Sequence, residues 1–346
     1  MKAVVFRRYK FPDSLELIEA ATPIPKENEV LVRIHAASVN SWDWDILHGV
    51  PFVNRIGFGL IRPREKIIGC DMAGTVEKVG RQVKDWQTGD KVMGDISGYG
   101  MGAFAGYVCV SGEILARKPD GMTFAEAAAM SHTGLLALQG LRDRGHVQKG
   151  KQVLINGAGG GSGTMAVQIA KSYGAEVTAV DSGTKLEMLR SLGADHVIDY
   201  KRENFTEGGK CYDLILDVVT FRSIFDYRRI LRPGGVYVML GGGSYRRVFQ
   251  CALFGPLITM RERLTRGKVG RKMGLLVYKP NRKDLEVLIT LFNAGAVVPV
   301  IDKSFALSEV RDAFRYYGAG IASGKVVIIV DGKLQAWQTG KSVQAP

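Results

Sequence analysis

The feature that most constrains this chain is a glycine-rich turn joining an apolar strand to a helix. Residues 152–156 form an apolar run around Val153, Leu154 and Ile155, typical of a buried parallel strand. Glycines follow at 157, 160 and 163, and a helix is expected over 164–173. Such a turn lets the backbone approach a phosphate closely, and the following helix N-terminus attracts negative charge. This strand–turn–helix motif therefore predicts a binding site for the pyrophosphate of a dinucleotide.

The surrounding sequence supplies the context that this motif requires. From about residue 124, helices and strands alternate in the order of a doubly wound parallel sheet. A plain glycine turn without a ligand is therefore the less favoured interpretation. We expect helices at 125–142, 185–192 and 222–231, and strands at 152–156, 177–180, 196–199, 212–219 and 235–240.

The residues before and after this region indicate a second, β-rich domain. Short β-rich runs alternate with glycine and proline turns at 2–6, 29–37, 67–79, 91–94 and 105–110, the pattern of a mostly antiparallel, barrel-like fold. After residue 284 we expect a helix, a strand near 297–301, a helix at 308–317, a strand at 325–330 and a loose tail from Gln335. The predicted domains are 1–123 with 284–346, and 124–283, with the catalytic cleft at their junction.

Composition narrows the class of protein. The chain has 346 residues, enough for two domains with a core each. No apolar stretch reaches the ~18 residues of a membrane span. The N-terminus lacks the apolar core of a signal peptide, so we expect a cytoplasmic protein. The cysteines show no C-x-x-C spacing, which argues against a disulfide framework or a zinc knuckle; they are Cys70, Cys109, Cys211 and Cys251.

The net charge of +13 is concentrated between residues 245 and 283. Many lysines and arginines stand there against one acid, Glu262, and the apolar run 248–258 lies in the same segment. We favour a solvated basic face beside a substrate lid. The alternative is contact with an anionic surface, and a membrane fits better than nucleic acid because stacking aromatics are not interleaved with the charges.

Several motifs together resemble the medium-chain dehydrogenase/reductase superfamily, in its zinc-independent quinone oxidoreductase branch. The resemblance covers nearly the whole chain. The matching segments are 37–43 (ASVNSWD), 68–76 (IGCDMAGTV), 89–92 (GDKV), the glycine turn and 192–200 (LGADHVIDY).

The resemblance implies an α/β protein with a GroES-like β-rich catalytic domain and a doubly wound Rossmann domain. It also implies NAD(P)H-dependent hydride transfer to a quinone or an α,β-unsaturated carbonyl, and a homodimer paired through the Rossmann sheet. The residues that it and the glycine turn assign to the cofactor are Gly157, Ala158, Gly159, Gly160, Gly161, Ser162, Gly163, Thr164, Asp181, Ser182, Lys185, Tyr200, Gly241 and Gly242.

A zinc-dependent alcohol dehydrogenase is the alternative within the superfamily. A catalytic zinc needs three thiolate or imidazole type ligands. The matching positions hold Asn40, Cys70 and His132. Asn40 is a poor zinc ligand and the lobe with four close cysteines is missing, so we expect no zinc, although Cys70 and His132 are competent ligands. An alternative of another class is a redox-sensitive scaffold that binds an anionic membrane surface through residues 245–283.

Without zinc, catalysis must rest on orientation and on hydrogen-bond donors aimed at the acceptor oxygen. Asn40 is the first candidate, as a donor to substrate or to the nicotinamide ribose; its alternative role is structural. Asp43 is a candidate that supports the same loop. His132 orients substrate or relays a proton, with a structural role as the equal alternative. Some relatives carry a tyrosine in the loop after this motif, but residues 41–60 contain none. The sequence therefore does not identify the proton donor, and water is the alternative source.

The cofactor residues point in two directions. Asp181 ends the second strand, where a carboxylate binds a ribose 2′-hydroxyl and favours NADH. Ser182 and Lys185, with Arg202, resemble a loop that holds a 2′-phosphate and favour NADPH. The resemblance favours NADPH, with NADH as the alternative. The loop at Gly241 and Gly242 is expected to approach the nicotinamide half, or else simply to turn the chain.

Overall fold

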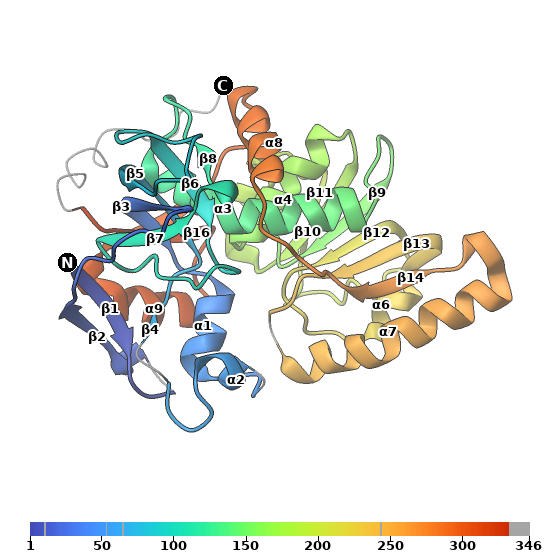
Figure 1. Cartoon of the computed structure of the whole chain (residues 1–346). Helices are drawn as coiled ribbons and strands as arrows, with labels where there is room; N and C mark the ends of the chain where they lie inside the picture. The colour runs from blue at the N-terminus through green and yellow to red at the C-terminus, as the bar shows by residue number, and fades with distance from the viewer. Residues whose placement is uncertain (10–11, 53, 64–65, 243, 332–346) are drawn as a thin grey trace. The chain divides into compact units, whose positions relative to one another are not determined.

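The computed structural model describes residues 1–9, 12–52, 54–63, 66–242 and 244–331. The chain forms two compact units, and Figure 1 shows their elements. Unit 1 contains residues 1–131, 303–321 and 326–346; unit 2 contains residues 132–302 and 322–325. Gly243 and the tail expected from Gln335 lie outside the described residues.

Unit 2 is built on a six-stranded sheet with the order β11-β10-β9-β12-β13-β14, in which every neighbouring pair is parallel. Helix α4 covers one face, and α6 and α7 cover the other (Figure 1). The predicted doubly wound arrangement is therefore confirmed. The elements are β9 (Gln152–Asn156), α4 (Gly161–Ser172), β10 (Glu176–Asp181), η4 (Gly183–Lys185), α5 (Leu186–Ser191), β11 (His196–Asp199), β12 (Tyr212–Asp217), α6 (Ile224–Arg229), β13 (Leu231–Met239), α7 (Tyr245–Arg266), η5 (Gly267–Val269), β14 (Lys272–Leu275) and α8 (Arg282–Asn293).

Unit 1 is β-rich, with a seven-stranded sheet and a three-stranded sheet. The long central strand β3 pairs antiparallel with β5, β7 and β16, which brings residues 327–329 beside residues 36–38. The elements are β1 (Lys2–Phe6), η1 (Pro12–Ser14), β2 (Leu15–Glu19), β3 (Glu29–Ser38), α1 (Ser41–His48), α2 (Asn54–Phe58), β4 (Lys66–Ile67), β5 (Asp71–Val79), β6 (Lys91–Asp95), β7 (Tyr107–Ser111), η2 (Gly112–Ile114), β8 (Ala116–Arg117), β15 (Ile301–Ala306), η6 (Leu307–Glu309), α9 (Val310–Gly318) and β16 (Lys325–Ile329). Helix α3 (Phe124–Leu138) and the π-helical segment η3 (Gln139–Arg144) follow β8.

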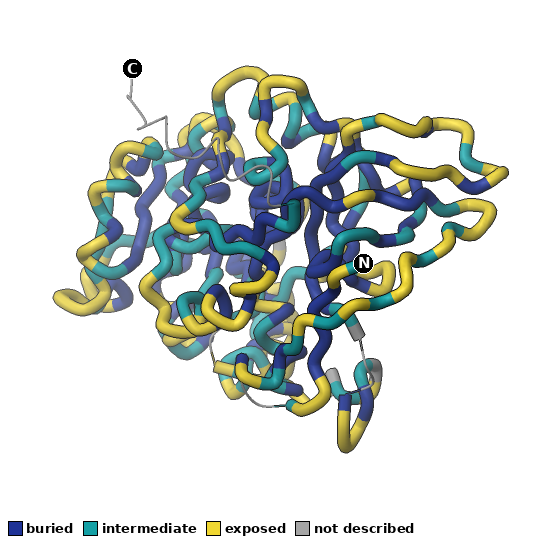
Figure 2. Tube along the Cα trace, turned by 90° about the vertical axis from the view of Figure 1, so that its left-hand side faces the viewer, coloured by how far each residue is buried: buried dark blue, intermediate teal, exposed yellow. Residues whose placement is uncertain are grey.

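Burial follows the elements. Strands β9, β10 and β12 are buried over nearly their whole length. Figure 2 shows long buried stretches of the trace and exposed positions gathered at its turns. The core of unit 2 includes Leu154, Ile215 and Tyr237, which are contributed by three neighbouring strands and are fully buried. Within the described residues, no helix combines the length and apolar character needed to cross a membrane.

The prediction of a strand near 297–301 is wrong. Strand β15 begins at Ile301 and continues to Ala306, while residues 297–300 are not part of a strand. Pro299 explains the difference, because proline has no N–H to donate to a sheet ladder.

Helix α8 was assigned to the β-rich domain from the sequence, but it belongs to unit 2. Its buried Asp284 accepts hydrogen bonds from Gln139 Nε2 at 2.8 Å and from Arg142 Nη2 at 2.6 Å. Leu288 packs against Gly134, where an added Cβ would lie 2.8 Å from its Cδ1. These contacts join residues 282–293 to the segment that precedes β9.

Candidate functional site

The glycine turn between β9 and α4 has the backbone geometry that close packing demands. Gly157 has φ = 77°, a left-handed backbone conformation that residues with a side chain rarely adopt. A Cβ on Gly163 would lie 2.2 Å from the Gly157 carbonyl oxygen and 2.5 Å from that of Ala158. Both positions therefore require glycine. At Gly160, by contrast, the nearest atom to an added Cβ is 3.7 Å away, so the protein itself leaves room there.

The remaining residues of the turn are fixed by backbone contacts. The N–H groups of Gly157 and Ala158 both donate to the Val180 carbonyl, at 3.0 and 3.1 Å. Gly160 caps α4, and Gly161 and Ser162 occupy its first turn. The buried Thr164 donates its hydroxyl to the Gly161 carbonyl at 3.0 Å. The first turn of α4 therefore begins directly above the carboxyl end of β9, where a helix N-terminus favours an anion.

Asp181 and Lys185 are both buried beside this turn. The Asp181 Oδ2 atom accepts the Gly159 N–H at 2.7 Å, and its Oδ1 atom accepts the Ser182 N–H at 2.8 Å. Lys185 Nζ lies 3.8 Å from Asp181 Oδ1 and donates to the Ala322 carbonyl at 2.6 Å. The two residues that pointed to different cofactors thus form one ion pair, and Lys185 neutralises the carboxylate.

Two aromatic rings lie near the carboxyl ends of β11 and β12. Tyr200 and Phe221 stack with their centroids 6.2 Å apart and 27° between their planes. With Arg222, Phe205 and Asn156 they line a pocket of about 240 Å³. Tyr200 was predicted from the sequence, whereas Phe221 and Arg222 were missed; the only available signal was an aromatic and basic pair soon after a buried strand.

These features fit a dinucleotide. A turn with no Cβ at Gly160, a helix N-terminus and a flat aromatic surface lie at one edge of the sheet, where open α/β sheets bind such ligands. Gly241 and Gly242 follow β13 at the same edge with φ of 104° and 85°. Among the residues that the structure describes, none places an atom within 4 Å of a Cβ built on Gly241, so this backbone is open to a ligand.

His132 is buried in α3 and faces a tyrosine that sequence reasoning missed. The Tyr278 hydroxyl lies 3.5 Å from His132 Nδ1, and the rings meet edge to face with centroids 5.4 Å apart. The neighbouring Thr133 lies beside the glycine turn, because its Cγ2 would be 3.1 Å from a Cβ on Gly161. Tyr278 follows β14 in the chain. A hydroxyl and an imidazole therefore lie together near the predicted cofactor turn.

Asn40 belongs to a buried polar cluster at the end of β3. Its Nδ2 atom donates to the Ser38 carbonyl at 3.1 Å and to Asp71 Oδ2 at 3.0 Å. Asp71 also accepts from the backbone N–H and the hydroxyl of Ser38. The amide donor proposed for substrate is thus engaged within unit 1, and its catalytic role stays a prediction.

Asp43 joins the start of α1 to the loop before β5. Its Oδ2 atom accepts the Asn40 N–H at 3.0 Å. Its Oδ1 atom accepts the Gly69 N–H at 3.1 Å and the Cys70 thiol at 3.2 Å. These are the contacts of a side chain that holds a loop in place, and a direct part in catalysis stays a prediction.

The donor set around Cys70 does not fit a zinc ion. Burial, followed by the nearby carboxylates of Asp43, Asp95 and Asp71, raises the pKa of the Cys70 thiol well above its usual value. Asn40, at one of the three positions that would have to hold the metal, offers a neutral amide, which is a poor zinc ligand. Among the described residues, no group of three or more His, Cys, Asp and Glu side chains is arranged to hold a metal.

Comparison with known families agrees with this geometry. Residues 26–120 match the alcohol dehydrogenase GroES-like domain, and residues 192–328 match the zinc-binding dehydrogenase family. Together these matches confirm the predicted fold class.

Individual relatives extend over nearly the whole chain. The 2-methylene-furan-3-one reductase of Solanum lycopersicum is 35% identical over 341 residues, 95% of this chain and 79% of that protein. The chloroplastic NADPH-dependent alkenal/one oxidoreductase of Arabidopsis thaliana is 32% identical over 342 residues, again 95% of this chain and 79% of that protein. The solved quinone oxidoreductase from Coxiella burnetii superposes with a TM-score of 0.83 at 28% identity, covering 96% of this chain and 99% of that one. The chain therefore belongs to the medium-chain dehydrogenase/reductase superfamily, in its quinone oxidoreductase-like branch.

Proposed function

We propose that this protein is an NAD(P)H-dependent reductase that transfers a hydride to a quinone or to an alkene conjugated to a carbonyl, without catalytic zinc. The observation that carries the proposal is the glycine turn with its aromatic pocket, which fits a dinucleotide. The names of the relatives, a furanone reductase, an alkenal/one oxidoreductase and a quinone oxidoreductase, support this substrate class. The neutral amide of Asn40, whose Nδ2 donates to Asp71, argues against the zinc alcohol dehydrogenase alternative.

The bound dinucleotide supplies a hydride, and the protein must supply the proton. Hydride addition to the β-carbon of an enone moves the π electrons onto the carbonyl oxygen, which then takes up a proton. We assign that proton to the Tyr278 hydroxyl, and its replacement to His132, whose Nδ1 lies 3.5 Å away. One hydride and one proton added to the substrate complete the reduction.

NADPH is our proposed cofactor because of the Asp181–Lys185 ion pair. An unpaired carboxylate at the end of β10 would repel a 2′-phosphate. Lys185 neutralises that charge from within the fold. The mostly exposed Arg202 adds a positive charge shortly after β11, although it pairs with Asp199 at 3.6 Å.

The test is oxidation of NADPH and NADH, followed by the loss of absorbance of the reduced nicotinamide, with 1,4-benzoquinone and with a 2-alkenal as acceptors. Turnover with either acceptor and retention of activity after dialysis against a chelator would support the proposal. A folded protein that binds neither dinucleotide would refute it.

We also propose a homodimer. At the β14 edge of the Rossmann sheet, pairing between two copies meets an obstacle. The Thr259 hydroxyl of α7 bonds both backbone groups of Met273, accepting its N–H at 2.9 Å and donating to its carbonyl at 3.2 Å. A second strand can pair with Met273 only if α7 moves. Light scattering of the eluted protein measures the oligomeric state directly.

A further inference from the structure

Helix α7 has one face that packs on the sheet of unit 2. Cys251, Gly255 and Glu262 are buried on this face. Gly255 lies against β14, where an added Cβ would be 2.9 Å from the Met273 carbonyl oxygen. Figure 1 shows α7 running alongside β14. The inner face, with Val248 and Ile258 packed against the core of unit 2, therefore accounts for how the helix is held.

The opposite face of α7 carries a row of large apolar side chains. Their spacing of three or four residues places them on one side of the helix. They are exposed by between 49% (Leu253) and 79% (Leu264) of their surface. Contiguous exposed apolar surface of this kind marks a contact with a partner or a membrane. The row, called here the outer stripe, consists of Phe249, Leu253, Leu257, Met260 and Leu264.

The outer stripe lies among positive charges. Arg246, Arg261 and Arg263 are exposed on α7, next to the stripe in the helical order. The one acid of the helix, Glu262, points inward, where the Arg228 guanidinium donates to its Oε1 at 2.6 and 3.1 Å. The exposed face of α7 is therefore apolar and basic, with no acid.

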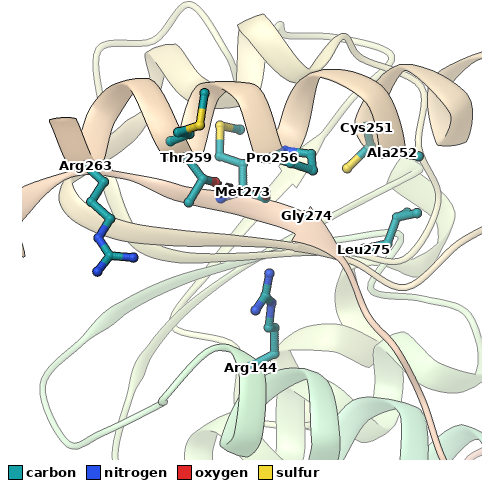
Figure 3. Close-up of a pocket in the computed structure, with 10 residues that line it drawn as sticks. Arg144, Cys251, Ala252, Pro256, Thr259, Arg263, Met273, Gly274 and Leu275 are labelled. Carbon is teal, nitrogen blue, oxygen red and sulfur yellow. Dashed lines mark hydrogen bonds between the residues drawn. The ribbon is translucent and has the colours of Figure 1, made fainter. Parts of the chain in front are cut away.

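A hollow adjoins the stripe on the β14 side. Its volume is about 520 Å³, and Met260 belongs to both the stripe and the hollow. Figure 3 shows Arg263 reaching from α7 and Arg144 reaching from the other side of the opening. The other side chains between them are mostly apolar and include Pro256, Met273 and Leu275. An acyl chain with an anionic head matches this combination of apolar floor and arginine rim.

We infer that α7 docks the protein on an anionic lipid bilayer, with the outer stripe in the headgroup region and the arginines on acidic lipid headgroups. Charge complementarity favours this occupant. A symmetric contact between two copies would bring the same arginines together, since a two-fold interface pairs a surface with itself. The inference goes beyond the reductase activity and does not depend on it.

The experiment is sedimentation of the full-length protein with vesicles of phosphatidylcholine alone or with phosphatidylglycerol, at low and at high salt. We expect binding only to the anionic vesicles and a steep loss of binding with salt. Leu257→Ser/Leu264→Ser should lower binding at least about tenfold, and Arg246→Glu/Arg263→Glu should abolish it. The matched controls are Ile24→Ser/Ile321→Ser and Arg8→Glu/Arg81→Glu, which change exposed residues of unit 1 and should bind like the wild type.

Circular dichroism and thermal midpoints show whether each variant is folded; all substituted side chains are exposed, so we expect native values. Failure to bind anionic vesicles at low salt would overturn the inference. Equal binding by the stripe variant and its control would also overturn it. Two further results would overturn it by assigning this face to another occupant. One is a wild-type dimer that becomes a monomer when the outer stripe is substituted. The other is binding of a DNA duplex that is equally strong in the wild type and in the stripe variant.

Discussion

Lys185 Nζ lies 3.8 Å from Asp181 Oδ1, and both side chains are buried beside the glycine turn. The pair connects two further parts of unit 2, because Asp181 accepts the Gly159 N–H and Lys185 donates to the Ala322 carbonyl. Neutralising a carboxylate at the end of β10 changes which dinucleotide the protein tolerates.

Replacing Lys185 by methionine should shift cofactor preference toward NADH. The carboxylate of Asp181 would then repel a 2′-phosphate, so we expect the ratio of KM for NADPH to KM for NADH to rise roughly tenfold. Steady-state kinetics with both cofactors measure this ratio. The exposed Lys149→Met is the control, and Asp181→Asn/Lys185→Met should restore the wild-type ratio. A ratio unchanged in Lys185→Met contradicts the argument.

Replacing Tyr278 by phenylalanine tests the proposed proton donor. Because the hydroxyl faces His132 Nδ1, its removal should lower kcat for enone reduction roughly a hundredfold or more while leaving NADPH affinity unchanged. The pH profile and the solvent isotope effect on kcat should change as well, which a purely structural tyrosine would not cause. Tyr99→Phe, at an exposed position, is the control. An unchanged kcat would assign the proton to water.

The sequence was sufficient for the parts of the site that depend on local spacing. Strand β9 has the predicted bounds, and Gly157 and Gly163 hold the turn, because strand, turn and helix are consecutive in the chain. The partnership of Asp181 with Lys185 was not predicted, since the two were interpreted as opposing signals for different cofactors. Tyr278 was missed because its meeting with His132 joins residues far apart in the sequence.

Helix α7 was missed for a different physical reason. Its apolar residues lie on two opposite faces, so no single stripe with the period of a helix stands out. Gly255 and Pro256 in its middle also indicate a break. Only the structure shows that Gly255 is there for close approach to β14.

Alanine substitutions at two glycines should separate folding from cofactor binding. Gly163→Ala forces a Cβ against two carbonyl oxygens and should lower the thermal midpoint of unfolding. Gly160→Ala meets no atom closer than 3.7 Å and should leave that midpoint unchanged. It should nevertheless weaken NADPH binding roughly tenfold or more, if phosphate occupies the space.

The control for both substitutions is Gly121→Ala, where no atom of the described part of the chain lies within 4 Å of an added Cβ. Fluorescence titration with NADPH gives the affinities, and thermal unfolding gives the midpoints. Wild-type NADPH affinity in Gly160→Ala would show that the pyrophosphate does not approach the turn at this residue.

Asp284 should make stability depend on pH in the acid range. Burial by itself raises the pKa of this carboxyl, but hydrogen bonds from Asn281, Arg142 and Gln139 outweigh burial and lower it overall. The stabilisation is therefore present above the ordinary pKa of about 3.9 and is lost as the pH falls through the lowered value. Asp284→Asn should cost roughly 1–3 kcal/mol of unfolding free energy at pH 7, and the loss should shrink below about pH 4.

Urea unfolding of wild type and Asp284→Asn at pH 7 and at acid pH measures this difference. Asp120→Asn is the matched control, because Asp120 is almost fully exposed and its contact with Lys91 is a surface ion pair 3.3 Å long. Such a surface pair contributes little to the unfolding free energy at any pH, so Asp120→Asn should have the stability of the wild type throughout. If Asp284→Asn lowers the unfolding free energy by the same amount at every pH, the charge of Asp284 is not what joins α8 to the η3 segment.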